Sequence, residues 1–142
     1  MVGYVGRFAP PPSGPLHLGS LLTAVASYIE ARASGGSWKL RIDDLDTKRV
    51  AVGSTKKILD SLLAHGLDWD GDIVYQSHHI EKYRSALQNL DDQALCFRCI
   101  CSRKDLKGKD IYPGTCRDEN FSTNINAAIR NRAPESENGF HD

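Results

Sequence analysis

The amino-acid sequence predicts an α/β fold, and two observations carry that prediction. The first is the order of the apolar patterns: residues 2–8 indicate a short buried strand, residues 19–33 a helix, and residues 38–42 an alternating second strand. A strand, a helix and a strand in this order predict a parallel βαβ unit with a right-handed crossover. The second observation is the loop at 9–17, which is rich in proline and leads directly into the helix. Proline sets φ in advance, so the backbone of this loop is stiff before any ligand arrives.

The remaining elements follow from spacing and turn residues. The first strand stops at Pro10, and Gly35 and Gly36 end the first helix, whose apolar residues are Leu21, Leu22, Val25, Ala26 and Ile29. A second helix is expected from an N-cap at Ser54 to a stop near Gly66, with Ile58, Leu59, Leu62 and Leu63 on one face.

Farther along, Asp70 and Gly71 predict a turn followed by a short strand. A third helix is expected from Ser77 to about Ala94, with inward residues Ile80, Tyr83, Leu87 and Leu90. The helical periodicity then stops at a cysteine-rich segment. Residues 127–134 suggest one more short strand, and residues 135–142 an exposed end.

Composition narrows the class of protein. The 142 residues include 18 basic and 18 acidic side chains, so the formal net charge is zero and does not indicate a nucleic-acid partner. With 40% hydrophobic residues the chain can form a core. The sequence has neither an apolar run long enough for a membrane span nor an export signal, so we expect a cytoplasmic protein with no membrane partner.

The start of the first helix is the first candidate site. A loop that leaves a strand and enters a helix is a common place to bind phosphate, because the first-turn amides have no helical partners. His17 could donate to a phosphate oxygen, and Gly19 lets a ligand approach the backbone. A helix-capping histidine and a packing glycine explain the same residues equally well, because His-x-Gly alone is a weak motif.

Longer stretches add a family resemblance. "RFAPPPSGPLHLGS" (7–20) and "RIDDLD" (41–46) resemble the "RFAPSPSGxLHxGS" and "RIEDxD" signatures of class I glutamyl-tRNA synthetases, with residues 17–20 at the "HIGH" motif. The segments "ARASGGSWKLRIDDLD", "LLAHGLDWDGDIVYQS", "YRSAL", "CICSR", "YPGTCR" and "AAIRNR" are together similar to the shorter glutamyl-Q tRNA(Asp) synthetases. The resemblance implies a ligase that activates glutamate with ATP, with Mg²⁺ as companion ion, and transfers it to queuosine in the anticodon of tRNA(Asp).

The resemblance also implies residue roles. The glutamate-binding positions would be Arg7, Phe8, Ala9, Pro10, Pro11 and Asp43. The ATP-binding positions would be Ser13, His17, Gly19 and Ser20, with His17 and Gly19 as the catalytic pair. Two positions depart from the family pattern. Pro11 replaces a serine, and Asp43 replaces a glutamate whose carboxylate would reach about 1 to 1.5 Å farther.

The four cysteines lie close together in sequence and indicate a metal before disulfides. Ligand spacing alone favours a zinc site of Cys96, Cys99, Cys101 and Cys116. The resemblance instead implies one structural Zn²⁺ on Cys99, Cys101, Tyr112 and Cys116, with Cys96 a buried apolar residue at the end of the third helix. Thiols without metal are the remaining alternative. Basic residues exceed acidic ones between positions 96 and 117, which suits either a tRNA backbone or a solvated face.

We therefore expect the first half of a Rossmann-like class I synthetase catalytic domain with a zinc-binding insertion. The expected parts are a nucleotide-binding half-domain at 1–95, a zinc-binding segment at 96–120, and a return strand with an exposed end at 121–142. No "KMSKS"-like lysine loop is found. On that expectation a second chain would cover the incomplete sheet, and the chain alone would activate little glutamate. The alternatives are the front half of an ordinary glutamyl-tRNA synthetase and a non-catalytic, zinc-stapled nucleotide- or RNA-binding fragment.

Overall fold

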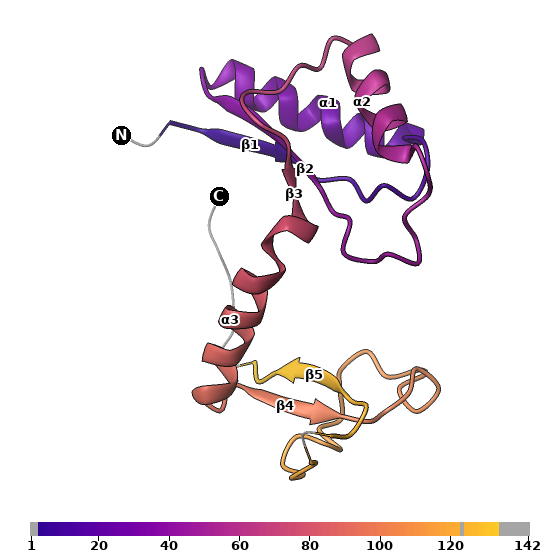
Figure 1. The fold of residues 1–142 in the computed structure, drawn as a ribbon, viewed down its shortest axis with the longest axis vertical. Coiled ribbons are helices and arrows are strands. Elements are labelled where there is room, and N and C mark those ends of the chain that lie inside the picture. Colours follow the sequence, from indigo (N-terminus) through magenta and orange to yellow (C-terminus); the bar gives the residue numbers. More distant parts are fainter. Residues whose placement is uncertain (1–2, 123, 134–142) are drawn as a thin grey trace. The chain divides into compact units, whose positions relative to one another are not determined.

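The computed structural model describes residues 3–122 and 124–133 of the chain, which divides into two compact units, Met1–Ile80 and Glu81–Asp142. In the first unit, strands β1 (Val5–Phe8), β2 (Ser37–Ile42) and β3 (Val74–Tyr75) form a sheet in the order β1-β2-β3 (Figure 1). Both strand pairs are parallel. The predicted α/β class and the parallel βαβ unit are confirmed.

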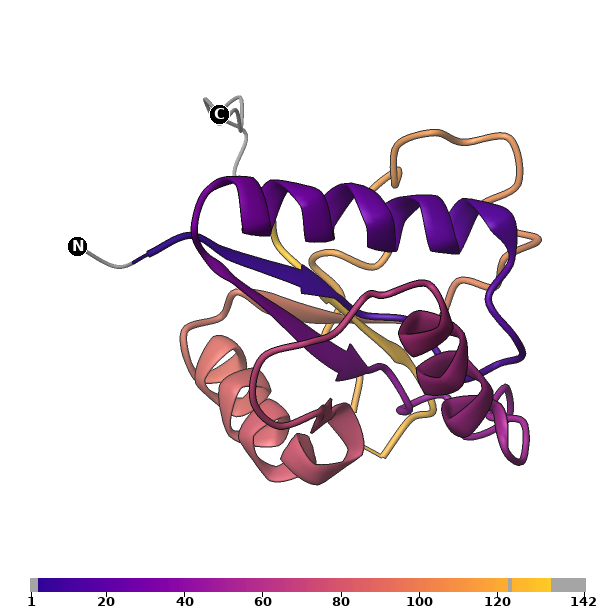
Figure 2. The ribbon, with the colours of Figure 1, turned by 90° about the horizontal axis from the view of Figure 1, so that it is seen from above.

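Helices α1 (Leu18–Ala33) and α2 (Ser54–Ala64) connect these strands, and Figure 2 shows α1 lying along the sheet. Both helices contribute to one buried cluster on a single face of the sheet. Its members are Phe8, Ala24, Ala31, Trp38, Leu40, Ile58, Leu62 and Leu67. Side chains alternate along a strand, so Val5, Arg7 and Lys39 point to the opposite face, where they are exposed.

Trp38 is at the centre of this cluster and is fully buried. Its ring stacks on Phe8, with centroids 6.2 Å apart, and meets the edge of Tyr28 at 5.3 Å. The indole N–H donates to Ser27 Oγ of α1 at 2.9 Å. The buried polar atom of the largest core residue is therefore satisfied, as burial of an indole requires.

Asp70 ties the same tryptophan to the first helix. One carboxylate oxygen of Asp70 accepts from the Trp38 backbone N–H and from Arg32, each at 2.7 Å. The Asp70 N–H in turn donates to the Trp38 carbonyl at 2.8 Å. The bond from the Trp38 backbone, followed by that from Arg32, holds the pKa of Asp70 below its usual value. Asp70, in the segment after α2, thus pairs with β2 before the predicted short strand, β3, begins.

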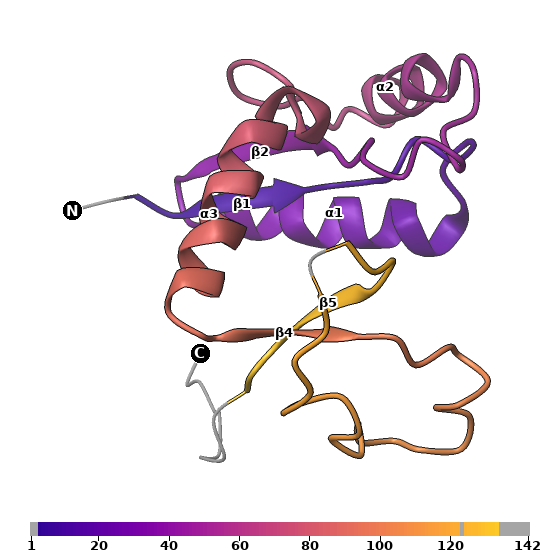
Figure 3. The same ribbon diagram turned by 60° about the horizontal axis from the view of Figure 1, so that its bottom comes forward.

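The second unit contains most of α3 (Ile80–Asp92) and a two-stranded antiparallel sheet of β4 (Cys96–Cys99) and β5 (Ala128–Asn131), visible in Figure 3. β5 confirms the strand predicted within 127–134. β4 was not predicted, because two cysteines and Arg98 within four residues hide its alternation. The predicted division at residues 95 and 120 stays a prediction.

The third helix differs from its prediction at both ends. A 3-10 helix, η1 (Gln76–His79), replaces its first turn, and Asp44 accepts there from the Ser77 N–H at 2.8 Å and the Ser77 hydroxyl at 2.6 Å. At the other end, Ala94 adopts φ of 54° and the Leu95 N–H returns to the Leu90 carbonyl, which closes the helix.

The expected inward face of α3 is not buried within the part of the chain that the structure describes. Ile80, Tyr83 and Leu87 are 37–41% exposed, and no residue of this helix is buried. The period was predicted correctly, but an apolar stripe is buried only where another element covers it.

Two details of the first two helices also differ. The N-cap of α2 is Gly53, with φ of 75°, and Ser54 is the buried first residue of the helix. Leu63 of α2 and Leu22 and Ile29 of α1 are exposed, because small residues, Ala24 and Ala31, make the closest approach of α1 to the core.

We expect Gly6→Ala to lower the free energy of unfolding by about 1–3 kcal/mol, as overpacking does. A Cβ at Gly6 would lie 2.9 Å from the Ser27 carbonyl oxygen and 3.0 Å from the Ala31 Cβ, so α1 would be pushed off the sheet. Gly3→Ala is the control, since a Cβ there meets nothing within 4 Å. Urea unfolding measures both; equal stability of the two variants would contradict the packing described.

Candidate functional site

Two loops meet at the carboxyl ends of β1 and β2. The Asp43 N–H donates to the Pro10 carbonyl at 3.1 Å, and the Ala51 N–H donates to the Pro12 carbonyl at 3.0 Å. The proline loop is therefore fixed to the segment that follows β2. In parallel sheets this edge, where the strands end, is where ligands bind.

His17 is the N-cap of α1. Its Nδ1 accepts from the Ser20 N–H at 3.2 Å, and its Nε2 lies 3.0 Å from the Ser20 hydroxyl. Because Nδ1 accepts, the neutral ring carries its proton on Nε2. The Ser20 amide is thus occupied by the cap, and the capping role weighed from the sequence is present in the structure.

Gly19 leaves the space that this ring uses. A Cβ at Gly19 would lie 3.1 Å from the His17 Cε1 and 3.2 Å from its Nδ1, closer than ordinary van der Waals contact. The His-x-Gly spacing therefore has a steric reason at the helix start. His17, Gly19 and Ser20, three of the four predicted ATP-binding residues, form one turn.

Asp43 is engaged by Arg41, a residue that the sequence reasoning did not single out. The Arg41 Nε and one terminal nitrogen donate to the two carboxylate oxygens at 2.6 and 3.1 Å, in a forked arrangement. Arg41 lies in β2, and Asp43 is the first residue after that strand, two positions farther along the chain. In the sequence, the spacing Arg-x-Asp was the signal that could have identified this ion pair. The carboxylate predicted to bind glutamate is already neutralised by its neighbour.

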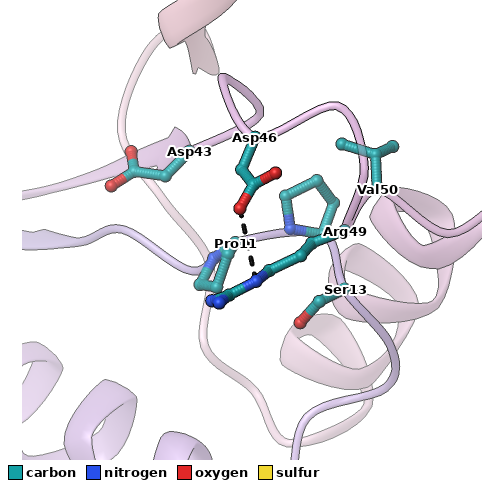
Figure 4. Close-up of a pocket in the computed structure, with 7 residues that line it drawn as sticks. Pro11, Ser13, Asp43, Asp46, Arg49 and Val50 are labelled. Carbon is teal, nitrogen blue, oxygen red and sulfur yellow. Dashed lines mark ion pairs between the residues drawn. The ribbon is translucent and has the colours of Figure 1, made fainter. Parts of the chain in front are cut away.

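A cavity of about 110 Å³ lies between the proline loop and residues 43–50 (Figure 4). Among the predicted residues, Pro11, Ser13 and Asp43 line it, together with Pro12, Asp46, Arg49 and Val50. Arg49 pairs with Asp46 at 3.2 Å and extends toward Pro11. The charged side chains of residues 43–50 thus face the prolines across this cavity. Neither Arg49 nor Asp46 was a predicted site residue.

The other predicted glutamate-binding residues differ in accessibility. Arg7 is exposed on the face of β1 away from the core, whereas the Phe8 ring is buried against Trp38. Ala9 is half-buried, and Pro10 is buried with its carbonyl bonded to Asp43. Of these four, Arg7 presents its side chain to solvent and Phe8 offers only its backbone.

A cluster of sulfur atoms forms the second candidate site, within the second unit. The sulfurs of Cys99, Cys101 and Cys116 all lie within 4.8 Å of one another. Cys101 and Cys116 are 3.6 Å apart, and the Tyr112 hydroxyl lies 3.4 Å from the Cys99 sulfur. A tetrahedral zinc with bonds of about 2.3 Å places its sulfurs about 3.8 Å apart. The donor set therefore fits one such ion.

Cys96 stands apart from this cluster. It is half-buried at the start of β4, three residues before Cys99, so strand alternation turns the two side chains to opposite faces. The structure brings Tyr112 to the three cysteines and does not bring Cys96. The expectation that Cys96 is a buried residue ending a helix is wrong, because the chain is a strand at that point.

The groups of the cluster differ in how readily they ionise. Burial opposes ionisation of the Cys99 thiol, but hydrogen bonding with Tyr112 and Arg130 outweighs it and lowers its pKa to about 6. The bond to Cys116, followed by burial, raises the pKa of Cys101. Burial and the neighbouring thiols raise the pKa of Tyr112. The surroundings of Cys99 thus favour its ionised form, whereas those of Cys101 and Tyr112 favour the neutral form.

Comparison with known proteins agrees with this geometry. The family described as "tRNA synthetases class I (E and Q), catalytic domain" matches residues 4–133. The chain belongs to this family. Among solved structures it resembles a glutamate tRNA ligase from Elizabethkingia meningosepticum, in complex with its amino acid, with a TM-score of 0.66 and 30% identity, covering 73% of this chain and 22% of that one. A glutamate-tRNA synthetase from Elizabethkingia anophelis gives 0.67 at 30% identity, covering 73% and 23%.

Within the family, several curated relatives carry a more particular name. Glutamyl-Q tRNA(Asp) synthetases of Pseudomonas syringae pv. tomato and Pseudomonas aeruginosa are each 49% identical over 140 residues, 98% of this chain and 47% of the relative. The chain thus spans about half the length of these relatives. The resemblance drawn from the sequence motifs is confirmed. Across residues 3–122 and 124–133, the structure has no helix of the length and apolarity that a membrane crossing needs.

We expect His17→Ala to lower stability by about 1 kcal/mol through loss of the N-cap. His17→Asn keeps a capping side chain and should retain the wild-type stability, although it removes the imidazole. Thermal unfolding of the two variants beside wild type measures the difference. An alanine variant as stable as the wild type would show that the Ser20 amide does not need this cap.

Proposed function

We propose that this chain provides the ATP-binding and glutamate-binding part of a ligase that attaches glutamate to queuosine in tRNA(Asp). The observation that carries the proposal is the position of the α1 N-terminus beside the carboxyl ends of β1 and β2, in a chain 49% identical to glutamyl-Q tRNA(Asp) synthetases. Helix N-termini favour anions, since unpaired amides and the helix dipole point toward them.

In this proposal the helix start binds the phosphates of ATP. The His17 Nε2–H lies beside the Ser20 hydroxyl and can turn to a phosphate oxygen, while Gly19 admits the ligand to the backbone. The glutamate carboxylate attacks the α-phosphate in line and pyrophosphate leaves. Donors held by a fixed backbone close to the developing charge stabilise the transition state with little reorganisation.

The amino-acid side of the site combines Arg7, Asp43 and Arg41. Arg7 would pair with a substrate carboxylate, for which a planar guanidinium is suited. Asp43 would receive the substrate ammonium while Arg41 holds its oxygens. Because that ion pair is half-buried and bidentate, an incoming ammonium shares the carboxylate with Arg41. Weaker amino-acid binding than with a free carboxylate follows from this pairing.

The sulfur cluster would hold one structural Zn²⁺, with Cys99, Cys101, Cys116 and Tyr112 as donors. All four positions are then filled by protein, so the metal folds the segment and activates no water. Without a cation the pKa of Tyr112 is raised by burial and by the thiols. A divalent ion reverses that tendency because its charge favours the deprotonated donors.

The ligand proposal is tested on the chain with ATP, followed by labelled glutamate and tRNA. We expect ATP to perturb the NMR signals of residues 17–20, and His17→Asn to weaken binding about 10- to 100-fold at unchanged stability. For transfer, the carboxyl-terminal half of the P. aeruginosa relative is supplied in trans. Label is expected on queuosine-containing tRNA(Asp). Label on tRNA(Glu) would instead identify an ordinary glutamyl-tRNA synthetase, and binding without transfer a binding fragment.

The metal proposal is tested by zinc content after purification. Wild type and Cys96→Ser should each retain about one Zn²⁺ per chain, whereas Cys116→Ser should lose it and Tyr112→Phe should bind it more weakly. Removing zinc with a chelator should lower the melting temperature of the second unit and leave unchanged the fluorescence of Trp38 and Trp69, which both lie in the first unit. Zinc loss in Cys96→Ser together with full retention in Tyr112→Phe would select the other donor set.

A further inference from the structure

We propose that Arg130 is a positioning residue of the sulfur cluster, holding the Cys99 sulfur and the Tyr112 ring in place and balancing the negative charge of the metal donors. The inference rests on the zinc site proposed above. It concerns a residue on the far strand of the small sheet, outside the segment that carries the four donors.

Strand register brings Arg130 to the cluster. In the antiparallel pair, Arg130 lies opposite Phe97, and Cys99 lies opposite Ala128. Phe97 and Cys99 are both buried and two residues apart, so they share a face. Arg130 is on that face too, as the diagonal neighbour of Cys99, within reach of a long side chain.

The side chain of Arg130 contacts two donors. Its guanidinium carbon lies 4.6 Å from the centre of the Tyr112 ring, a cation–π distance. It also lies within hydrogen-bonding reach of the Cys99 sulfur, its diagonal neighbour across the sheet. Its Nε is buried and has no hydrogen-bond partner within the described chain. A metal-bound thiolate at Cys99 is a stronger acceptor for this guanidinium than a neutral thiol.

Charge balance gives this contact a purpose. Three thiolates already exceed the two charges of a zinc ion, and a phenolate adds a fourth negative charge. The excess is costly in a buried site unless a cation is nearby. A guanidinium against one thiolate and one ring face reduces that cost and restricts where both donors can move.

Arg132 is the matched comparison on the same strand. It lies two residues farther on, and its guanidinium carbon is 5.4 Å from the centre of the Phe97 ring. Its partners, however, are the Asp118 carboxylate at 3.1 Å and the Arg117 carbonyl. Arg132 is therefore a suitable control. It stacks on an aromatic ring of the same small sheet, but its hydrogen bonds do not involve the four donor residues.

The test is zinc affinity of the full 142-residue chain, measured with Zn²⁺ alone in competition with a chromophoric chelator. Arg130→Met keeps most of the side-chain length but removes the charge, and we expect about 10- to 100-fold weaker binding. Arg130→Lys keeps the charge without the fork and should fall between Met and wild type. Arg132→Met should stay within about twofold of wild type, since it loses an exposed ion pair and a bond to the Arg117 carbonyl, neither of which involves a donor atom of the cluster.

Cobalt substitution supplies a readout that packing alone would not move. A cation beside a thiolate lowers the energy of its lone pairs, so Arg130→Met should shift the thiolate-to-Co²⁺ charge-transfer band to longer wavelength. Arg132→Met should leave the band where it is. If Arg130→Met does not fold by circular dichroism, Arg130→Lys decides through its affinity: a loss greater than the twofold range of Arg132→Met supports the proposal, and an affinity within that range overturns it.

The outcomes separate the two proposals. Wild-type affinity and an unshifted band in a folded Arg130→Met variant would overturn the role of Arg130 and leave the zinc site standing. Equal losses in the Arg130 and Arg132 methionine variants would also overturn it, because the effect would then come from the strand as a whole. A wild-type chain that binds neither Zn²⁺ nor Co²⁺ would overturn the zinc site and this inference together.

Discussion

The first unit depends on the bonds between Asp70 and Trp38. β2 is the central strand, but β3 pairs only with its last two residues. Asp70 satisfies the Trp38 backbone N–H and carbonyl where the third strand is missing, and the same carboxylate oxygen binds Arg32 of α1. The tryptophan ring then fills the space between α1 and β1. Because a charged acceptor satisfies a backbone donor and a guanidinium together, helix and strand are held in one arrangement. The loops that follow β1 and β2 inherit their positions from it.

Those loops combine a rigid backbone before α1 with an internal ion pair after β2. Prolines and two backbone bonds fix the approach to α1, and His17 closes its first turn. Beside them, Asp43 and Arg41 neutralise each other. In the proposed site, the helix end would receive an anion on a backbone that is already fixed, and a substrate ammonium would compete with the internal ion pair of Asp43 and Arg41. Under that proposal, the stiff loop before the helix and the ion pair after β2 would act on different ligands.

The second unit is organised by sulfur chemistry and not by a large apolar core. Its buried cluster is small, comprising Phe97, Cys99 and Cys116 with Cys101, Tyr112 and Phe121 packed against it. Small units with few buried side chains need an additional staple, and four convergent donors supply the chemistry of one. The arginines of β5 then lie over the aromatic members of this cluster. One strand thus serves both to pair with β4 and to place positive charge against donors that would be anionic around a metal.

The sequence by itself determined the strand-helix-strand order, the helix start at His17 and the donor types of the cluster, because these depend on local periodicity, turn residues and side-chain chemistry. Tertiary structure decided the rest. Whether Leu22 or Ala24 is buried depends on how closely α1 approaches the sheet, which no helical period states. That Cys96 lies apart from Cys99 depends on β4 being a strand, and strand formation there needs β5, far along the chain. Arg130 reaches the cluster for the same reason: its place is set by pairing register, which arises only when the two strands meet.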